Sequence, residues 1–377
     1  MSQAALQSVA LPPRTYRKVN EFVIAARGVP LSRCRLYLGT GSQTNTVALT
    51  TSKKMAAARP KPYYQIIDGV PRCPFMTPET LRQGLDFVAR KGDLLQVSYP
   101  RSGTHWVQYI TQLILKEGEP VDTYEQFMEG AKFIEYFVDA PDCKQSTPMR
   151  TLCTHLPLRK DKLNPEAKYI YVARNPWDVC VSLYHHEKNL SVFRFEDGTF
   201  DDFLEVFLTG ELGYGFYFDH VTAGYALKDE PNVFFLTYEE LTRDTRRTVL
   251  RLARFIGERF GEMLEEEGEE RLSLILQRSS ARNMKDIMIF NLREIPDPGM
   301  QKLFDKLNPS SKAAHGGDAK CHEVLRQAKV GGWRECFTPK QLRRMEATIE
   351  ETTRGSDVME LWSDIRREAL TLCEQSG

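Results

Sequence analysis

Residues 93–115 read DLLQVSYPRSGTHWVQYITQLIL, and this stretch indicates the fold of the chain. Its first part, Asp93–Ser98, has the length and composition of a short buried strand. From Thr104 to Leu115 the apolar residues recur at the spacing of one helical face. The turn between them contains Pro, Ser and Gly, which are typical of loops. The stretch therefore predicts a strand, a loop and a helix, in that order.

The same plan occurs twice more along the chain. Lys168–Ala173 is an apolar run, and a break at Arg174–Pro176 separates it from a predicted helix that starts at Trp177. Asn232–Tyr238 is a third run, followed by a predicted helix over Asp244–Ile256. Strands that alternate with helices predict an α/β fold, here a single domain with a central parallel sheet flanked by helices. Ligands of such sheets bind at the carboxyl ends of the strands.

The composition excludes several classes of protein. Hydrophobic residues make up 41% and charged residues 27% of the 377 residues, which is typical of a globular chain. Lys plus Arg equals Asp plus Glu at 51 each, so a polybasic nucleic-acid binder is not expected. No apolar run approaches the roughly 18 residues that a membrane span needs. We therefore expect a soluble protein, with neither nucleic acid nor membrane as a partner.

The cysteines predict free thiols in a reducing compartment, because no two of them form a CxxC pair. Their spacing resembles neither a zinc site nor a disulfide scaffold, so no metal is expected. They stand at positions 34, 73, 143, 153, 180, 321, 336 and 373.

The balanced charge conceals a basic segment at the start of the chain. Residues 1–54 hold eight basic groups and one acidic group, Glu21, and they are rich in Ser, Thr, Ala and Gly. Three interpretations remain open: a disordered leader, a mitochondrial-type transit peptide, or translated sequence ahead of a start at Met55. A transit peptide needs an amphipathic helix, which Pro12, Pro13 and Pro30 interrupt. We favour a dispensable leader over residues 1–54 and a single domain over 55–377.

The loop Tyr99–Trp106 has the properties of a phosphate site. A helix that begins after a tight turn offers free backbone N–H groups and the positive end of its dipole to an anion. Gly103 allows a close approach, Ser102 adds a hydroxyl, and Arg101 adds a fixed positive charge. The arrangement is P-loop-like, but the GxxxxGK[ST] pattern is absent, which argues against a nucleotide kinase. Taken alone, the loop is equally compatible with an ordinary strand–helix turn.

A second segment repeats these features. Arg174 stands at the end of a predicted strand, Pro176 suits the first turn of a helix, and Ser182 lies about two turns further on. Two strand ends, each with an arginine and hydroxyl groups, suit a ligand that carries two separated phosphates.

At this point the sequence resembles the cytosolic sulfotransferases. Their YPKSGTxW and RNPxDxxxSxYxH segments correspond to YPRSGTHW at 99–106 and RNPWDVCVSLYH at 174–185. Their KTHLP motif corresponds to Cys153–Pro157, a TYEDL-like segment to Thr237–Leu241, and an RKGxxGDWK segment to Arg326–Arg334. The resemblance extends over most of residues 55–377. It implies a P-loop-like strand–loop–helix that binds phosphosulfate and an enzyme that transfers a sulfuryl group from 3′-phosphoadenosine 5′-phosphosulfate (PAPS) to a hydroxyl or amine without a metal.

The resemblance also implies roles for individual residues. His155 matches the catalytic base, since a neutral imidazole can accept a proton at pH 7. Arg101 matches a lysine beside the leaving phosphate, and arginine keeps that charge but does not give up a proton. Trp106 and Tyr238 match contacts to adenine, although Trp106 also suits a core position of its helix. The matched cofactor positions are Arg101, Ser102, Gly103, Thr104, His105, Trp106, Arg174, Ser182, Tyr238, Ser279, Arg326, Gln327 and Ala328.

Several positions depart from the family pattern. Cys153 replaces a lysine, Gln327 and Ala328 replace Lys-Gly, and Ala281 stands where an aromatic residue is frequent. These changes indicate weaker PAPS affinity and leave open a catalytically weak protein that binds PAPS or its product PAP. Near the C-terminus Pro339 and Arg343 interrupt the family's dimer segment, so a homodimer is possible with an altered interface.

The acceptor site is less clear from the sequence. Phe133, Tyr136 and Phe137 precede the His155 motif and form a candidate aromatic wall for a flat phenol. Plain core packing of these rings explains them equally well. The resemblance leaves phenols, catecholamines and steroid-like molecules as acceptors.

Overall fold

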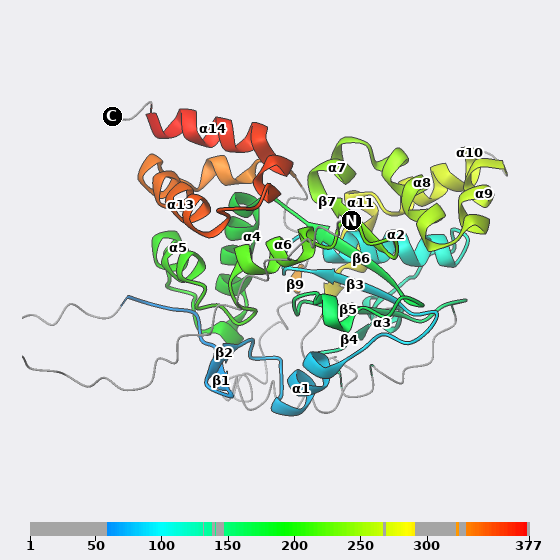
Figure 1. Cartoon of the computed structure of the whole chain (residues 1–377), viewed down its shortest axis with the longest axis horizontal. Coiled ribbons are helices and arrows are strands. Elements are labelled where there is room, and N and C mark those ends of the chain that lie inside the picture. The colour runs from blue at the N-terminus through cyan, green and yellow to red at the C-terminus, as the bar shows by residue number, and fades with distance from the viewer. Residues whose placement is uncertain are drawn as a thin grey trace, which may run out of the picture. The chain divides into compact units, whose positions relative to one another are not determined.

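A five-stranded sheet lies at the centre of the structure (Figure 1). The structure is a computed structural model, and it describes residues 59–130, 132–137, 140, 147–266, 269–290, 322–323 and 329–374. The strand order is β4-β5-β3-β6-β7, and every neighbouring pair is parallel. The predicted parallel sheet is therefore confirmed. Its strands are β4 (Lys132–Phe133), β5 (Thr151–Thr154), β3 (Leu94–Ser98), β6 (Lys168–Ala173) and β7 (Val233–Thr237).

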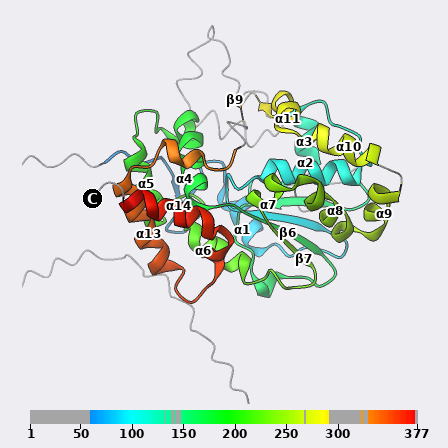
Figure 2. The ribbon, with the colours of Figure 1, turned by 90° about the horizontal axis from the view of Figure 1, so that it is seen from above.

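Side chains alternate between the two faces of the sheet, and helices cover both faces (Figures 1 and 2). Leu94 of β3 packs into one apolar cluster, while Leu95 and Val97 pack into the other. The first cluster includes α2 (Thr104–Leu115), α3 (Tyr124–Glu129), α8 (Thr245–Ile256), α9 (Glu258–Glu266), α10 (Glu269–Arg278) and α11 (Ala281–Ile287). The second includes α1 (Pro78–Asp86), α4 (Pro176–Asn189), α5 (Phe200–Thr209), α6 (Tyr217–Tyr225), α13 (Pro339–Thr352) and α14 (Ser363–Glu374).

The predicted elements appear within one or two residues of their expected bounds. The helix expected over Thr104–Leu115 is α2, and the strand expected over Lys168–Ala173 is β6. The remaining regular elements were not predicted from the sequence. They include β1 (Gln65–Ile67), β2 (Val70–Arg72), α7 (Tyr238–Arg243), β8 (Ile289–Phe290), β9 (His322–Glu323) and the short 3-10 helices Lys160–Lys162, Ser191–Phe193, Gly332–Glu335 and Val358–Trp362.

Helix starts agree with local sequence signals. Asn175 caps α4 by accepting a hydrogen bond from the Asp178 N–H at 2.8 Å, and Pro176 occupies the first turn. Thr338 caps α13 in the same way, and Pro339 takes its first position. Pro339, which interrupts the family's dimer pattern, is therefore the first residue of a helix. Proline is tolerated at that position.

Some predictions lie outside the described residues. They concern the leader over residues 1–54 and the candidate cofactor positions 326–328. Within the ranges described above, no helix has both the length and the hydrophobicity of a membrane span. The five cysteines in those ranges, at 73, 153, 180, 336 and 373, are free thiols.

Candidate functional site

The loop between β3 and α2 leaves the start of the helix open to a ligand. Gly103 caps α2 with a positive φ of 100°, and among the described residues no side chain caps this helix start by accepting from its first N–H groups. A Cβ atom at Gly103 would lie 2.7 Å from Cδ2 of Tyr238, so a larger residue does not fit there. The first N–H groups of α2 therefore remain available to an anion.

Three buried polar atoms around this loop lack a hydrogen-bond partner among the residues that the structure describes: Ser102 Oγ, Trp106 Nε1 and Arg174 Nε. Buried polar atoms nearly always have a partner, so such a group calls for an explanation. A bound anionic nucleotide supplies phosphate oxygens and ring nitrogens that could accept from these groups. The donor set therefore fits PAPS.

The two predicted segments come together at the carboxyl ends of two central strands of the sheet. Because β3 and β6 are neighbouring parallel strands, their carboxyl ends lie side by side. Arg101 Nε donates a hydrogen bond to Ser182 Oγ at 3.1 Å, and Arg174 Nη1 donates to the Arg101 carbonyl oxygen at 3.0 Å. The Arg174 guanidinium also lies 4.3 Å from the centre of the Tyr238 ring, which itself lies 5.5 Å from the Trp106 ring. Direct contacts thus connect two cations and two aromatic rings at the carboxyl ends of β3 and β6.

Asp178, which sequence reasoning did not select, connects Arg174 to a segment near the C-terminus. Asp178 lies 3.9 Å from Arg174 Nη2 and accepts hydrogen bonds from the Gly331 and Trp333 N–H groups at 2.7 and 3.0 Å. Arg174 Nη2 also donates to the Lys329 carbonyl oxygen at 2.9 Å. The segment 329–333 is thereby held against Arg174. The sequence feature that could have indicated this role is the spacing of Asp178, four residues after Arg174 in the RNPWD segment.

His155 follows β5 and faces the end of β3. Its Nδ1–H donates a hydrogen bond to the Ser98 carbonyl oxygen at 2.8 Å. Because a carbonyl oxygen only accepts, this bond places the proton of the neutral ring on Nδ1 and leaves the lone pair on Nε2. The side chain is 7% exposed, and burial lowers the pKa of His155 to about 4, aided by the positive charge of Arg101. The ring is therefore neutral at pH 7 and can accept a proton at Nε2.

Aromatic rings enclose His155. Phe133 lies 4.9 Å from the His155 ring, and Tyr214 meets it edge-on at 5.5 Å. Tyr136 packs on Phe133 at 5.3 Å and is hydrogen-bonded to the hydroxyl of Tyr214. Of the three expected wall residues, Phe133 thus contacts His155 directly, whereas Tyr136 and Phe137 pack against Phe133. Tyr214 was missed because it comes from a loop about 60 residues away in the sequence.

The remaining candidate residues have other contacts. His105 packs on Phe127 at 5.5 Å, and burial together with the Arg101 charge lowers the pKa of His105 to about 3. Thr104 and Ser98 share a hydrogen bond between their hydroxyls at 2.8 Å. Ser279 donates to the Ile275 carbonyl oxygen of its own helix.

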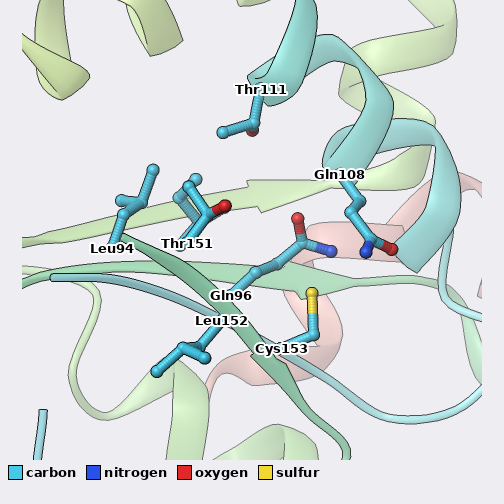
Figure 3. Close-up of a pocket in the computed structure, with 8 residues that line it drawn as sticks. Leu94, Gln96, Gln108, Thr111, Thr151, Leu152 and Cys153 are labelled. Atoms are coloured by element: carbon cyan, nitrogen blue, oxygen red, sulfur yellow. The ribbon is translucent and has the colours of Figure 1, made fainter. Parts of the chain in front are cut away.

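A small cavity lies beneath α2, next to the residue that departs from the family pattern (Figure 3). Gln108 and Thr111 reach down from α2 towards Gln96 of β3 and Cys153 of β5. Its volume is about 10 Å³, which is close to the minimum for a single water molecule. Gln96 closes it on the loop side by donating to the Thr104 carbonyl oxygen at 2.8 Å. The cavity is too small for a nucleotide or an acceptor.

Comparisons with known proteins agree with this geometry. The family model of the sulfotransferase domain matches residues 91–357. Sulfotransferase 2B1 of Mus musculus is 33% identical over 270 residues, which cover 71% of this chain and 72% of that protein. The amine sulfotransferase of Oryctolagus cuniculus is 30% identical over 288 residues, or 75% of this chain and 88% of that protein. A crystal structure of mouse sulfotransferase SULT7A1 complexed with PAP shares the fold, with a TM-score of 0.53 and 24% identity over 83% of this chain and 99% of that chain.

Proposed function

This chain belongs to the sulfotransferase family, and from that premise we propose that it transfers a sulfuryl group from PAPS to a hydroxyl or amine of a small molecule. The observation that carries the proposal is the contact of Arg101 with Ser182 and Arg174, together with the bond from His155 to Ser98 at the end of β3. The PAP molecule in the SULT7A1 structure supports the choice of donor.

The loop residues and the second strand end would hold the donor. Ser102, Thr104 and the N-terminus of α2 suit its phosphosulfate end, while Arg174 and Ser182 suit the 3′-phosphate. Trp106 and Tyr238 offer aromatic surface for the adenine. When bound, PAPS supplies the sulfuryl group and leaves as 3′,5′-diphosphoadenosine. No metal is part of this proposal.

His155 would act as the general base. Its Nε2 lone pair accepts the proton of the acceptor hydroxyl, while the bond from Nδ1–H to Ser98 keeps the ring in the required tautomer. Arg101 would act through its charge, which stabilises negative charge that develops on the leaving phosphate. Because arginine stays protonated, Arg101 would donate hydrogen bonds without transferring a proton.

Phe133, Tyr136 and Phe137 would form one wall of the acceptor site. The Phe133 ring lies next to His155 and the Tyr136 ring packs on Phe133, which suits a flat phenol, a catecholamine or a steroid-like alcohol. The amine sulfotransferase among the relatives supports amines as a further class. We place the enzyme in the cytoplasm, because it resembles the cytosolic members of the family and its five described cysteines are free thiols.

Radiolabelled sulfate transfer from PAPS to a panel of phenols, catecholamines, steroids and amines tests the proposal. The wild type is expected to label at least one class. His155→Ala is expected to lower turnover by at least about a hundredfold, the usual contribution of general base catalysis. Calorimetry with PAP is the control, since the variant should bind it as the wild type does. Equal turnover in the two proteins would show that His155 is not the base.

One observation favours a second candidate, a catalytically weak protein that binds PAPS or PAP. Cys153 is fully buried where the family has a lysine, and burial raises the pKa of its thiol well above the usual range. The position therefore carries no positive charge. Tight PAP binding with no transfer to any acceptor of the panel would favour this candidate.

A further inference from the structure

A carboxyl group that the proposed reaction does not use lies directly behind His155. Glu135 is completely buried, and its Oε1 accepts a hydrogen bond from the His155 backbone N–H at 2.7 Å. Its Oε2 is also buried and has no hydrogen-bond partner among the described residues. A half-satisfied buried carboxyl is costly, so its place next to the proposed base calls for a function.

The turn that carries Glu135 is fixed on two sides. On the sheet side, Ile134 N–H donates to the Cys153 carbonyl oxygen at 3.0 Å. On the other side, Gln83 Nε2 of α1 donates to the carbonyl oxygens of Ile134 and Phe137, each at 3.1 Å. Gly84 lets α1 approach closely, because a Cβ there would lie 2.7 Å from Cδ1 of Leu156 and would touch Cβ of Glu135 at 3.4 Å. The turn therefore cannot shift without disturbing β5 or α1.

His155 is thus held at two points, its ring by Ser98 and its main chain by Glu135. We propose that Glu135 is a positioning residue, which fixes the main chain of His155 through its Oε1 and places a negative charge behind the imidazolium that forms when Nε2 accepts the acceptor's proton. This inference rests on the proposed role of His155 as the base. It requires that Glu135 bear its charge in the pH range where the enzyme works.

The other titratable groups around Glu135 stay neutral near pH 7. Burial raises the pKa of Cys73 to about 12 and the pKa values of Tyr136 and Cys153 well above their usual range. Helix α1 faces the turn with the uncharged Gln83 and Gly84. Burial raises the pKa of Glu135 itself to about 7, against the lowering effect of the His155 N–H and the Thr154 hydroxyl. Within the described part of this shell, Glu135 is therefore the group that changes charge near pH 7.

The rate of the chemical step should consequently rise with pH as Glu135 ionises. Single-turnover rates at saturating PAPS and acceptor, measured from pH 6 to 8.5, test this in the wild type and two variants. Glu135→Gln keeps an oxygen that accepts from the His155 N–H but carries no charge. We expect it to match the wild type at pH 6 and to lack the rise. Glu135→Met provides neither acceptor nor charge, and we expect at least about a tenfold lower rate at every pH.

Calorimetry with PAP is the control. Glu135 is not among the residues that we propose to contact PAPS, so the affinity for PAP should be the same in both variants and the wild type. A Glu135→Gln profile that rises as the wild-type profile does would overturn the inference, and so would a folded Glu135→Met protein with the wild-type rate. If Glu135→Met fails to fold, the Gln profile alone decides. His155→Ala separates the two proposals. Full activity of His155→Ala refutes the proposed base, whereas its inactivity together with a wild-type profile in both Glu135 variants refutes only the role of Glu135.

Discussion

At the scale of single residues, buried carboxyl groups hold together parts of the chain that are distant in sequence. Glu187 of α4 is a second example besides Glu135. It is completely buried, and the Tyr64 hydroxyl donates a hydrogen bond to Glu187 Oε2 at 2.5 Å. Burial raises the pKa of Glu187 to about 8. The carboxyl therefore joins the segment before β1 to α4 while it is mostly protonated at pH 7.

This pKa predicts how stability depends on pH. In the unfolded chain Glu187 ionises near pH 4.3, whereas in the folded chain it stays protonated up to about 8. The protonated Glu187 carboxyl therefore contributes fully to the stability of the folded chain below pH 4. This contribution is lost as the pH rises to 8. Glu187→Gln keeps an acceptor for Tyr64 and does not titrate. We compare the free energy of unfolding of this variant with that of the wild type, measured with urea. The difference should shift in favour of the variant by roughly 3–5 kcal/mol between pH 5 and pH 8.

The control for this prediction is Glu196→Gln, because Glu196 is exposed and its replacement removes the same negative charge. We expect that variant to differ from the wild type by the same small amount at both pH values. A Glu187→Gln protein whose stability relative to the wild type does not change with pH would show that the buried carboxyl is ionised in the folded chain.

At the scale of elements, the strand–loop–helix from β3 to α2 depends on one glycine. Gly103 combines a positive φ with a place where an added Cβ would lie only 2.7 Å from Cδ2 of Tyr238. Gly103→Ala adds backbone strain of about 1–3 kcal/mol and pushes Tyr238 away from its place beside Trp106 and Arg174. We expect the variant to lose at least about tenfold in PAP affinity by calorimetry.

Gly92 offers a matched control at the other end of β3. Its φ is 81°, yet a Cβ there would meet nothing within 4 Å. Gly92→Ala should therefore show a similar loss of stability with unchanged PAP affinity. Equal affinity losses in the two variants would mean that backbone strain, and not the contact with Tyr238, weakens binding.

The start of α4 depends on Asp178, which joins this helix to the segment 329–333. Asp178→Ala leaves the Gly331 and Trp333 N–H groups without their acceptor and removes the carboxylate beside Arg174. We expect the KM for PAPS to rise by about tenfold, while the single-turnover rate at saturating PAPS changes little.

A cap outside the site provides the comparison for Asp178. Asp244 caps α8 by accepting from the Arg247 N–H at 3.0 Å. Asp244→Ala should cost about 1 kcal/mol of stability and leave the KM for PAPS unchanged. If both aspartate variants raised that KM equally, general destabilisation would explain the effect of Asp178.

At the scale of the whole molecule, we propose that residues 1–54 are dispensable. The family model of the sulfotransferase domain begins at residue 91, well after this segment. A chain that starts at Met55 should keep the sulfotransferase activity and the midpoint of thermal unfolding of the full chain. Loss of PAP binding on this deletion would contradict the proposal.

A longer deletion, up to residue 66, is the matched comparison. It removes the bond from Tyr63 N–H to the Phe193 carbonyl oxygen and the bond from Tyr64 to Glu187. We expect this chain to unfold at a lower temperature, because Glu187 then remains buried without its donor.

Local patterns were sufficient to predict the elements that carry the site. Strands β3, β6 and β7 are rich in apolar residues because both of their faces are buried, and the helices α2 and α8 show a clear apolar stripe. Strands β4 and β5 were not predicted. They have two and four residues, which is too short for a periodic pattern, and their pairing depends on partners elsewhere in the chain.

The sequence by itself determined which residues stand at the ends of β3 and β6, since adjacent residues form each motif and local physics places them on a strand, a loop and a helix. Only the tertiary structure decided which side chains meet there. Tyr214 and Glu135 reach His155, and Asp178 holds the segment 329–333, across distances in sequence that no local pattern records. The physical reason is that burial and hydrogen bonding between distant segments, not residue type, determine the proton positions and charges on which the proposed chemistry depends.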